Sequence, residues 1–241
     1  MTESTIPTVV LVHGAFADAG SWSGVIAELQ GHGVPVVAPP NPLRGLAADA
    51  AYVASVAAQI DGPVVLVGHS YGGAVITVAG AAENVVGLVY VAAYVLEDGE
   101  SLGELQGRFA DSPLGANLRQ ASYPVEGGGS AVEFTIAPEA FPEIFAADVP
   151  AEVTRVLAVT QRPLAGGAFA EAASTAAWRA KPSWAVVAGA DQAINPEVER
   201  FGAERAGATV VEVAGASHAI AVSRPEEVAG VIREAVRAVS A

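Results

Sequence analysis

The chain has 241 residues, of which 52% are hydrophobic, and this length suits one domain or one domain with a sizeable insertion. Its formal net charge of −14 argues against nucleic acid and anionic membrane surfaces as partners, because both require a basic face. It contains no cysteine, which excludes disulfides, thiolate metal sites and cysteine nucleophiles.

Short, nearly continuous apolar runs alternate with alanine-rich stretches along most of the chain. Such runs are typical of strands buried on both faces of a parallel sheet, and the stretches between them indicate crossover helices. The pattern predicts an α/β fold with a doubly wound, mostly parallel six-stranded sheet, in which ligands gather beyond the carboxyl ends of the strands. The expected strands are 9–12, 35–38, 64–67, 85–92, 183–188 and 209–213. The expected helices are 22–31, 46–60, 71–82, 197–206 and 225–239.

Residues 97–181 interrupt this alternation, because proline and glycine separate short helical stretches there. The segment is too long for an ordinary connection, so we expect a helical cap inserted in a core of residues 1–96 and 182–241. Its glycine triplet, 127–129, favours a flexible linker, with a hairpin as the alternative. We expect the aromatic residues of the cap to cover the site, namely Phe109, Tyr123, Phe134, Phe141 and Phe145.

The stretch LVGHSYGGAV, residues 66–75, places Ser70 after an apolar run and before a helical segment. A tight strand–turn–helix of this kind lifts a serine clear of the sheet, and the neighbouring glycines permit the turn. The same turn directs the Tyr71 amide towards the position where an oxyanion would form. Ser70 is therefore the candidate nucleophile, and an ordinary turn serine is the alternative.

A serine hydroxyl needs a base to take its proton, and the chain has four histidines. His218 follows the last predicted strand, at the carboxyl edge of the sheet where Ser70 also emerges. We expect His218 to be the base, with a loop histidine satisfied by local hydrogen bonds as the alternative. For the others we expect a surface turn at His32, packing behind the serine at His69, and hydrogen bonding within the first loop at His13.

The base in turn needs an acid that holds its tautomer and stabilises the imidazolium. Asp191 follows the predicted strand 183–188, which gives the chain order serine, aspartate, histidine expected for a site of this kind. Asp98, after the predicted strand 85–92, is the rival acid. Taken without its partners, Asp191 is explained equally well as a helix-capping residue.

The loop after the first predicted strand, in VLVHGAFADAGSW, offers free backbone amides. We expect the Ala15 amide to be the second donor to an oxyanion, beside Tyr71. We expect Phe16, Trp22 and Ile194 to line the substrate pocket, and plain core packing explains Phe16 and Trp22 equally well.

By these residues the chain resembles the α/β-hydrolase family, and most closely the branch of plant methylesterases, hydroxynitrile lyases and bacterial carboxylesterases. The resemblance rests on VLVHGAFADAGSW, LVGHSYGG, AGADQAINP and GASHAIAVSRP. A further stretch, DVPAEVTRVLAVTQRP, is similar to the cap of that branch, whereas residues 99–146 match only loosely. The resemblance implies an acyl-transfer enzyme that uses no cofactor and no metal, with a helical cap over an apolar pocket. It also implies that the Ala15 and Tyr71 amides form the oxyanion hole.

These features predict a serine carboxylic-ester hydrolase that acts through an acyl-enzyme on a small or medium, largely apolar ester. The alternatives are a lyase, perhydrolase or cyclase on the same scaffold, or a non-catalytic small-molecule binder. A hydroxynitrile lyase is disfavoured, because lyases of this branch have a lysine after the catalytic histidine and a threonine after the first-strand histidine. Here those positions hold Ala219 and Gly14, and the only lysine is Lys181. We expect Gly14 to leave room for a water and an acyl group beside the serine.

The opening MTESTIPT lacks a basic start and an apolar core, so we expect no signal peptide and a cytoplasmic protein. No apolar run reaches the length of a membrane span, about 18 residues. The expected partner is a small-molecule ester. The sequence leaves the oligomeric state open, a homodimer included.

Overall fold

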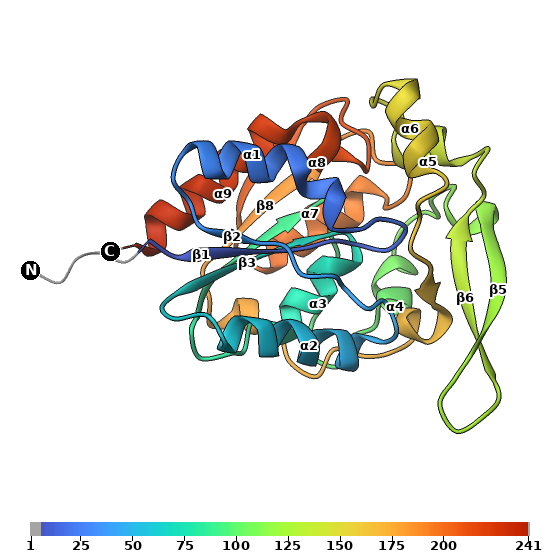
Figure 1. Ribbon diagram of the computed structural model, residues 1–241, viewed down its shortest axis with the longest axis horizontal. Coiled ribbons are helices and arrows are strands. Elements are labelled where there is room, and N and C mark those ends of the chain that lie inside the picture. Colours follow the sequence, from blue (N-terminus) through green and yellow to red (C-terminus); the bar gives the residue numbers. More distant parts are fainter. Residues whose placement is uncertain (1–5, 241) are drawn as a thin grey trace, which may run out of the picture.

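The computed structural model describes residues 6–240, and its centre is a parallel sheet with helices on both faces (Figure 1). The strand order is β2-β1-β3-β4-β8-β9, and every neighbouring pair is parallel. The predicted fold class is therefore confirmed. The strands are β1 (Thr8–Val12), β2 (Val36–Val37), β3 (Val64–His69), β4 (Val85–Val91), β8 (Ser183–Ala188) and β9 (Thr209–Val213).

Strand β3 shows why these runs are apolar throughout. Successive side chains of a strand point to opposite faces, so Val64 and Leu66 pack in one hydrophobic cluster and Val65 and Val67 in another. All six residues of β3 are buried. A sheet covered on both faces thus requires apolar residues at every position of its central strands.

The helices divide between the two faces of the sheet. Helices α1, α8 and α9 supply residues to the cluster that holds Val65, and α2, α3 and α7 supply residues to the cluster that holds Leu66. In Figure 1, α1 and α9 lie above the sheet and α2 and α3 below it. No helix within residues 6–240 combines the length and apolarity needed to cross a membrane. The helices are α1 (Ser23–Gly31), α2 (Leu46–Ala58), α3 (Tyr71–Ala79), α7 (Pro196–Arg205), α8 (Ile220–Ser223) and α9 (Pro225–Val239).

The predicted cap segment contains strands as well as short helices. Its three strands form an antiparallel sheet of their own, in the order β5-β6-β7. The glycine triplet 127–129 connects β5 to β6 with φ values of 84°, 88° and 110°, a backbone conformation that glycine adopts without strain. The expectation of a flexible linker there is therefore wrong, and the hairpin alternative is correct. The elements are α4 (Leu102–Gln106), β5 (Leu118–Pro124), β6 (Ser130–Ile136), α5 (Phe141–Phe145), α6 (Ala151–Leu157) and β7 (Leu164–Ala165).

The cap segment shares its hydrophobic core with the parallel sheet. Leu102 and Phe141 from the cap belong to the same cluster as Leu66 of β3 and Ile76 of α3. The β5–β6 hairpin extends away from the body of the molecule (Figure 1). The rest of the cap therefore gains its burial from contact with the sheet domain. The boundaries at residues 97 and 181 stay a prediction.

Candidate active site

Ser70 lies in the turn between β3 and α3, with backbone angles of φ 55° and ψ −122°. A non-glycine residue in this region costs about 1–3 kcal/mol, so the surrounding chain must hold it there. Two glycines make the turn possible because other chain segments come very close. A Cβ on Gly68 would lie 2.3 Å from the Gly72 carbonyl oxygen, and a Cβ on Gly72 would lie 2.4 Å from the Val12 carbonyl oxygen. The local sequence thus forms the strained turn that the serine motif predicts.

His218 and Asp191 form a buried pair at the carboxyl edge of the sheet. His218 Nδ1 donates to Asp191 Oδ2 at 2.5 Å, and each residue is only 2% exposed. The other carboxylate oxygen, Oδ1, accepts from the amides of Ala193 at 2.7 Å and Ile194 at 2.9 Å. With the proton on Nδ1, the Nε2 atom of His218 is left as the proton acceptor.

Ser70 and His218 line the same cavity, together with Ala15 and Tyr71. No hydrogen bond joins the Ser70 hydroxyl to His218 within the residues that the structure describes. In proteins without a bound substrate such contacts are often long or poorly aligned. The structure therefore brings the predicted serine, histidine and aspartate together, with the histidine–aspartate contact formed.

The rival acid Asp98 and the other histidines lie outside the catalytic pair. Asp98 lies on an exposed turn and lines a surface groove with Arg179, so it is not the partner of His218. His69 Nε2 hydrogen-bonds the His218 carbonyl oxygen at 2.8 Å, and burial holds the pKa of His69 well below its ordinary value. His32 is exposed. The placements of His69 and His32 agree with the sequence-based expectations, whereas the alternative of Asp98 as the acid is wrong.

His13 organises the first loop, as expected. Its Nε2 accepts from the Asn41 amide at 2.9 Å and its Nδ1 bonds the Gly14 carbonyl oxygen at 2.9 Å. The Asn41 side chain in turn donates to the His13 carbonyl oxygen at 2.9 Å. Burial lowers the pKa of His13, which favours the neutral ring that these bonds require.

The two expected oxyanion donors, the amides of Ala15 and Tyr71, belong to residues that line the cavity with Ser70. Tyr71 is the first residue of α3, where an amide has no partner within the helix and the helix dipole favours a negative charge. Ala15 comes three residues after β1 and lines the same cavity. Neither amide donates a hydrogen bond within residues 6–240. Both are therefore available to a group bound in the cavity.

Gly14 does not leave the space that the sequence suggested. A Cβ at this position would lie 2.6 Å from Ser70 Cβ and 3.2 Å from Ser70 Oγ. The volume of the missing side chain is already filled by the serine, so there is no room there for a water and an acyl group. Glycine is instead required because the first loop packs directly on the Ser70 turn.

Replacing Gly14 with alanine is therefore expected to lower the free energy of unfolding by about 1–3 kcal/mol, because the added methyl group overlaps Ser70 and the His69 carbonyl oxygen. Gly230 is the matched control, since a Cβ there meets nothing within 4 Å and alanine is the better helix former. Urea unfolding of both variants provides the measurement. A Gly14→Ala variant as stable as Gly230→Ala would show that the loop tolerates the contact.

The cavity next to Ser70 is small, about 310 Å³, and mostly apolar. Phe16 and Ile194 line it, as expected, whereas Trp22 does not. Trp22 is wholly buried among the residues packed on the α1 and α9 face, with its ring 6.2 Å from that of His69. The expectation of Trp22 in the pocket is therefore wrong, and the core-packing alternative is correct.

The cap supplies part of the cavity wall, but not through the five aromatic residues that were expected there. None of those five lies in the cavity wall that the structure describes. Phe109 packs on Phe201 with 5.5 Å between ring centroids, and the hairpin residue Tyr123 lies under the Arg44 guanidinium at 4.4 Å. The lining residues missed by the sequence analysis are Tyr94, Leu102, Leu114, Leu164, Phe169 and Ala193.

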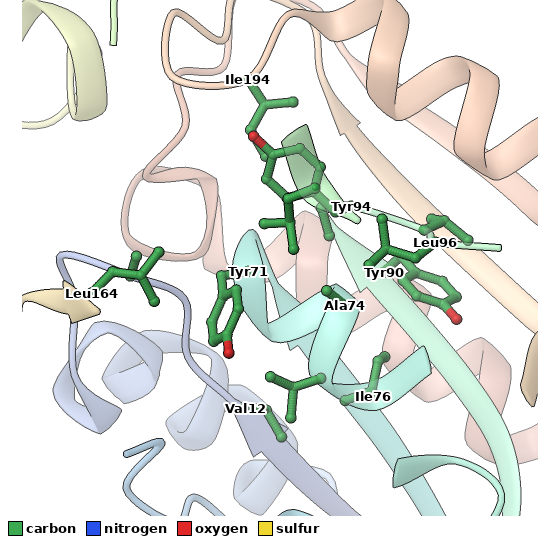
Figure 2. Packing of buried hydrophobic residues seen from close by; sticks show 14 of the residues in the cluster. Val12, Tyr71, Ala74, Ile76, Tyr90, Tyr94, Leu96, Leu164 and Ile194 are labelled. Carbon is green, nitrogen blue, oxygen red and sulfur yellow. The ribbon is translucent and has the colours of Figure 1, made fainter. Parts of the chain in front are cut away.

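Figure 2 shows how part of this wall is arranged. Ile194 lies beside the Tyr94 ring, and the hydroxyl of Tyr71 points away from both. That hydroxyl donates to the buried Asp49 carboxylate at 2.8 Å, which fixes the side chain of the residue after Ser70. Tyr94 follows β4 by three residues, so its place at the carboxyl edge was open to prediction. The cap leucines and Phe169 had no periodic signal that could have identified them.

The cap also holds the segment that carries His218. Ser217 donates to Asp148 at 2.5 Å, and the Ala219 amide donates to the Phe145 carbonyl oxygen at 2.8 Å. The Phe145 ring packs edge-on against the His218 ring, with 4.8 Å between centroids. The position of His218 therefore depends on the cap as well as on the sheet.

A family model described as the alpha/beta hydrolase family matches residues 9–231. The chain belongs to this family. Among curated proteins, none matches the chain significantly. The family assignment thus rests on a match that spans the sheet, the cap and all the candidate site residues.

Several solved structures share this hydrolase fold at low sequence identity. A polyneuridine aldehyde esterase is 20% identical with a TM-score of 0.82, covering 95% of this chain and 99% of its own. A pyrethroid hydrolase from Sphingobium faniae JZ-2 is 22% identical with a TM-score of 0.76, covering 97% of this chain and 98% of its own. A methylesterase from Arabidopsis is 17% identical with a TM-score of 0.76, covering 96% of this chain and 99% of its own. At such identities the likeness shows the fold alone.

Proposed function

We propose that this α/β hydrolase is a serine carboxylic-ester hydrolase for small or medium, largely apolar esters. The observation that carries the proposal is the convergence of the Ser70 turn and the His218–Asp191 pair on one apolar cavity. Three structural neighbours, an esterase, a pyrethroid hydrolase and a methylesterase, support the same class of reaction.

In the proposed reaction the Ser70 hydroxyl attacks the ester carbonyl carbon while His218 Nε2 takes its proton. The carbonyl oxygen becomes an oxyanion that accepts hydrogen bonds from the Ala15 and Tyr71 amides. The intermediate collapses, and the alcohol leaves with the proton from His218, which gives an acyl ester on Ser70. His218 then takes a proton from water, the hydroxide attacks the acyl carbon, and the acid leaves as Ser70 regains its proton.

The lining of the cavity supports a neutral, apolar substrate. Among its described lining residues, His218 is the only one of the acidic and basic types, and the rest are mainly aliphatic and aromatic. A charged group placed there would lose its hydration without gaining an opposite charge. The small cavity also supports a small-molecule ester over a peptide, because the empty space in it is about 310 Å³ even with open solvent included.

The same lining disfavours a cyanohydrin lyase. Departing cyanide needs a cation to stabilise it, and Lys181 lies in a surface groove with Arg179 and Asp98 instead of in the cavity wall. No observation favours a perhydrolase, a cyclase or a non-catalytic binder over hydrolysis. The cytoplasmic location, the absence of a cofactor and a homodimer stay expectations from the sequence.

The proposal is tested with the purified protein, p-nitrophenyl and methyl esters of increasing acyl length, and mandelonitrile. We expect hydrolysis of short and medium apolar esters that is lost in Ser70→Ala. Cyanohydrin cleavage that depends on Ser70 and is faster than ester hydrolysis would identify a lyase instead. Binding of the esters with no turnover would identify a receptor.

Phe169 is expected to limit the length of the acyl or alcohol group. Its half-buried ring lines the cavity, so Phe169→Ala should raise the kcat/KM ratio of longer to shorter esters by about tenfold. Phe109→Ala is the matched control, since Phe109 is also a half-buried cap phenylalanine but packs on Phe201. An equal change in both variants would mean that the effect comes from loosening of the cap and not from the cavity wall.

A further inference from the structure

Glu199 is a buried acid that the proposed reaction does not use. It lies on α7, it is 3% exposed, and its Oε2 accepts from the Ala188 amide at 3.0 Å. Ala188 is the last residue of β8, just before the loop that carries Asp191. Its other oxygen, Oε1, is buried and has no partner close enough and well enough aligned for a hydrogen bond. An orphaned carboxyl oxygen at this depth calls for an explanation.

The neighbours of Glu199 favour its neutral form. Burial, followed by the charge of Asp191, raises the pKa of Glu199 well above its ordinary value. The pKa of Tyr94, whose hydroxyl donates to Gln106 at 2.6 Å, is likewise raised by burial and by the charges of Asp191 and Glu199. The same helix carries two arginines. Arg200 is held by Glu212 through contacts of 2.9 and 2.7 Å, and Arg205 is held by Glu100 at 2.7 Å. Two adjacent buried carboxyls without a dedicated cation cannot both be charged at low cost.

We propose that Glu199 is a positioning residue that stays protonated and donates from Oε1 to the Asp191 carboxylate. Asp191 would then be held by the Ala193 and Ile194 amides and by Glu199, with Oδ2 left to bind His218. The donated hydrogen bond disperses part of the negative charge of Asp191, which sets the strength of the hydrogen bond between Asp191 and His218. The role in catalysis rests on the proposed function, whereas the protonation state does not.

Glutamine reproduces the proposed state, because its carbonyl oxygen can accept from Ala188 while its NH₂ group donates to Asp191. We therefore expect Glu199→Gln to keep kcat/KM within about threefold, because an isosteric donor replaces the hydrogen bond. Glu199→Leu removes both contacts, so kcat should fall about tenfold to a hundredfold with little change in KM. Glu204→Gln, on the exposed side of the same helix, is the control and should change neither value.

The pH profile of kcat/KM separates this role from simple packing. We expect the apparent pKa of the catalytic base to be unchanged in Glu199→Gln and raised in Glu199→Leu, where Asp191 loses a donor. A lower apparent pKa in Glu199→Gln would mean that a negative charge had been removed, and it would overturn the proposal. So would equal losses of activity in the glutamine and leucine variants.

Thermal unfolding tests the protonation state without any activity. In the unfolded chain Glu199 loses its proton above the ordinary glutamate pKa of 4.5. If the folded chain keeps Glu199 neutral, folding must take up a proton above that pH, so the free energy of unfolding of the wild type falls as pH rises. Glutamine takes up no proton. The melting temperature of Glu199→Gln minus that of the wild type should therefore increase from pH 5 to pH 8, while that of Glu204→Gln should stay constant. If the melting-temperature difference of Glu199→Gln stays constant with pH, the proposal is overturned even if the protein hydrolyses esters. If the difference increases, a neutral Glu199 is supported even if the protein does not hydrolyse esters.

Discussion

Ser70→Ala is expected to lower ester hydrolysis by at least about 10⁴-fold while the melting temperature stays close to that of the wild type. The loss is large because, among the described residues that line the cavity with His218, Ser70 is the only serine, threonine, cysteine or lysine. The fold should persist because alanine keeps the Cβ atom that packs on Gly14 and loses only the hydroxyl oxygen. Turnover of a p-nitrophenyl ester and the melting temperature are measured on the same preparation.

Ser183→Ala is the matched control for this variant. Ser183 is 7% exposed, as is Ser70, but it lies at the amino end of β8, at the opposite edge of the sheet from the cavity. We expect full activity from it. Ser70→Ala with more than about a hundredth of wild-type activity would remove Ser70 from the role of nucleophile.

Asp191→Asn is expected to lower kcat about 10³- to 10⁴-fold. The two amide protons of Ala193 and Ile194 point at one carboxylate oxygen, so the single carbonyl oxygen of asparagine should face them and its NH₂ group should face His218. An NH₂ group cannot accept from Nδ1, and the histidine must therefore carry its proton on Nε2, where it cannot take one from Ser70.

Asp98→Asn is the control for the rival acid and should keep activity within about twofold, because exposed side chains remote from a site rarely affect it. Both variants are compared with the wild type by steady-state kinetics, with the melting temperature as a check on folding. Comparable losses in the two variants would mean that the pairing of His218 with Asp191 does not carry the reaction.

The parallel sheet could be predicted closely because its strands are marked by local sequence. Strands 183–188 and 209–213 have the predicted limits, since Pro182 and Gly189 bound the first and a run of β-branched residues marks the second. Helix limits were less certain: the predicted helix 71–82 ends at Ala79, where Gly80 follows and the chain tightens into a turn. The site residues were predictable for the same reason as the strands, because strand ends in a parallel sheet meet at one edge.

The cap and the pocket wall could not be predicted in this way. Trp22 and Phe16 are six residues apart in one loop, and only the 3₁₀ turn Ala19–Trp22, capped by Asp18, directs Trp22 into the core behind the sheet. The five cap aromatics were expected over the site because burial seemed to require it. Of these, Phe145 packs against the His218 ring, whereas Phe109 packs on Phe201 and Tyr123 lies under Arg44. Such contacts between distant segments leave no periodic trace in the sequence.

The central claim is that Ser70 forms a covalent acyl-enzyme with His218 as its base, and trapping the serine tests it most directly. A phosphonate ester directed at serine is incubated with the wild type and with His218→Ala, and the modified peptide is located by mass spectrometry. We expect a single adduct on Ser70 in the wild type, loss of ester hydrolysis in proportion to labelling, and a much slower adduct in His218→Ala. An adduct on another residue, or ester hydrolysis that persists after Ser70 is fully labelled, would contradict the account.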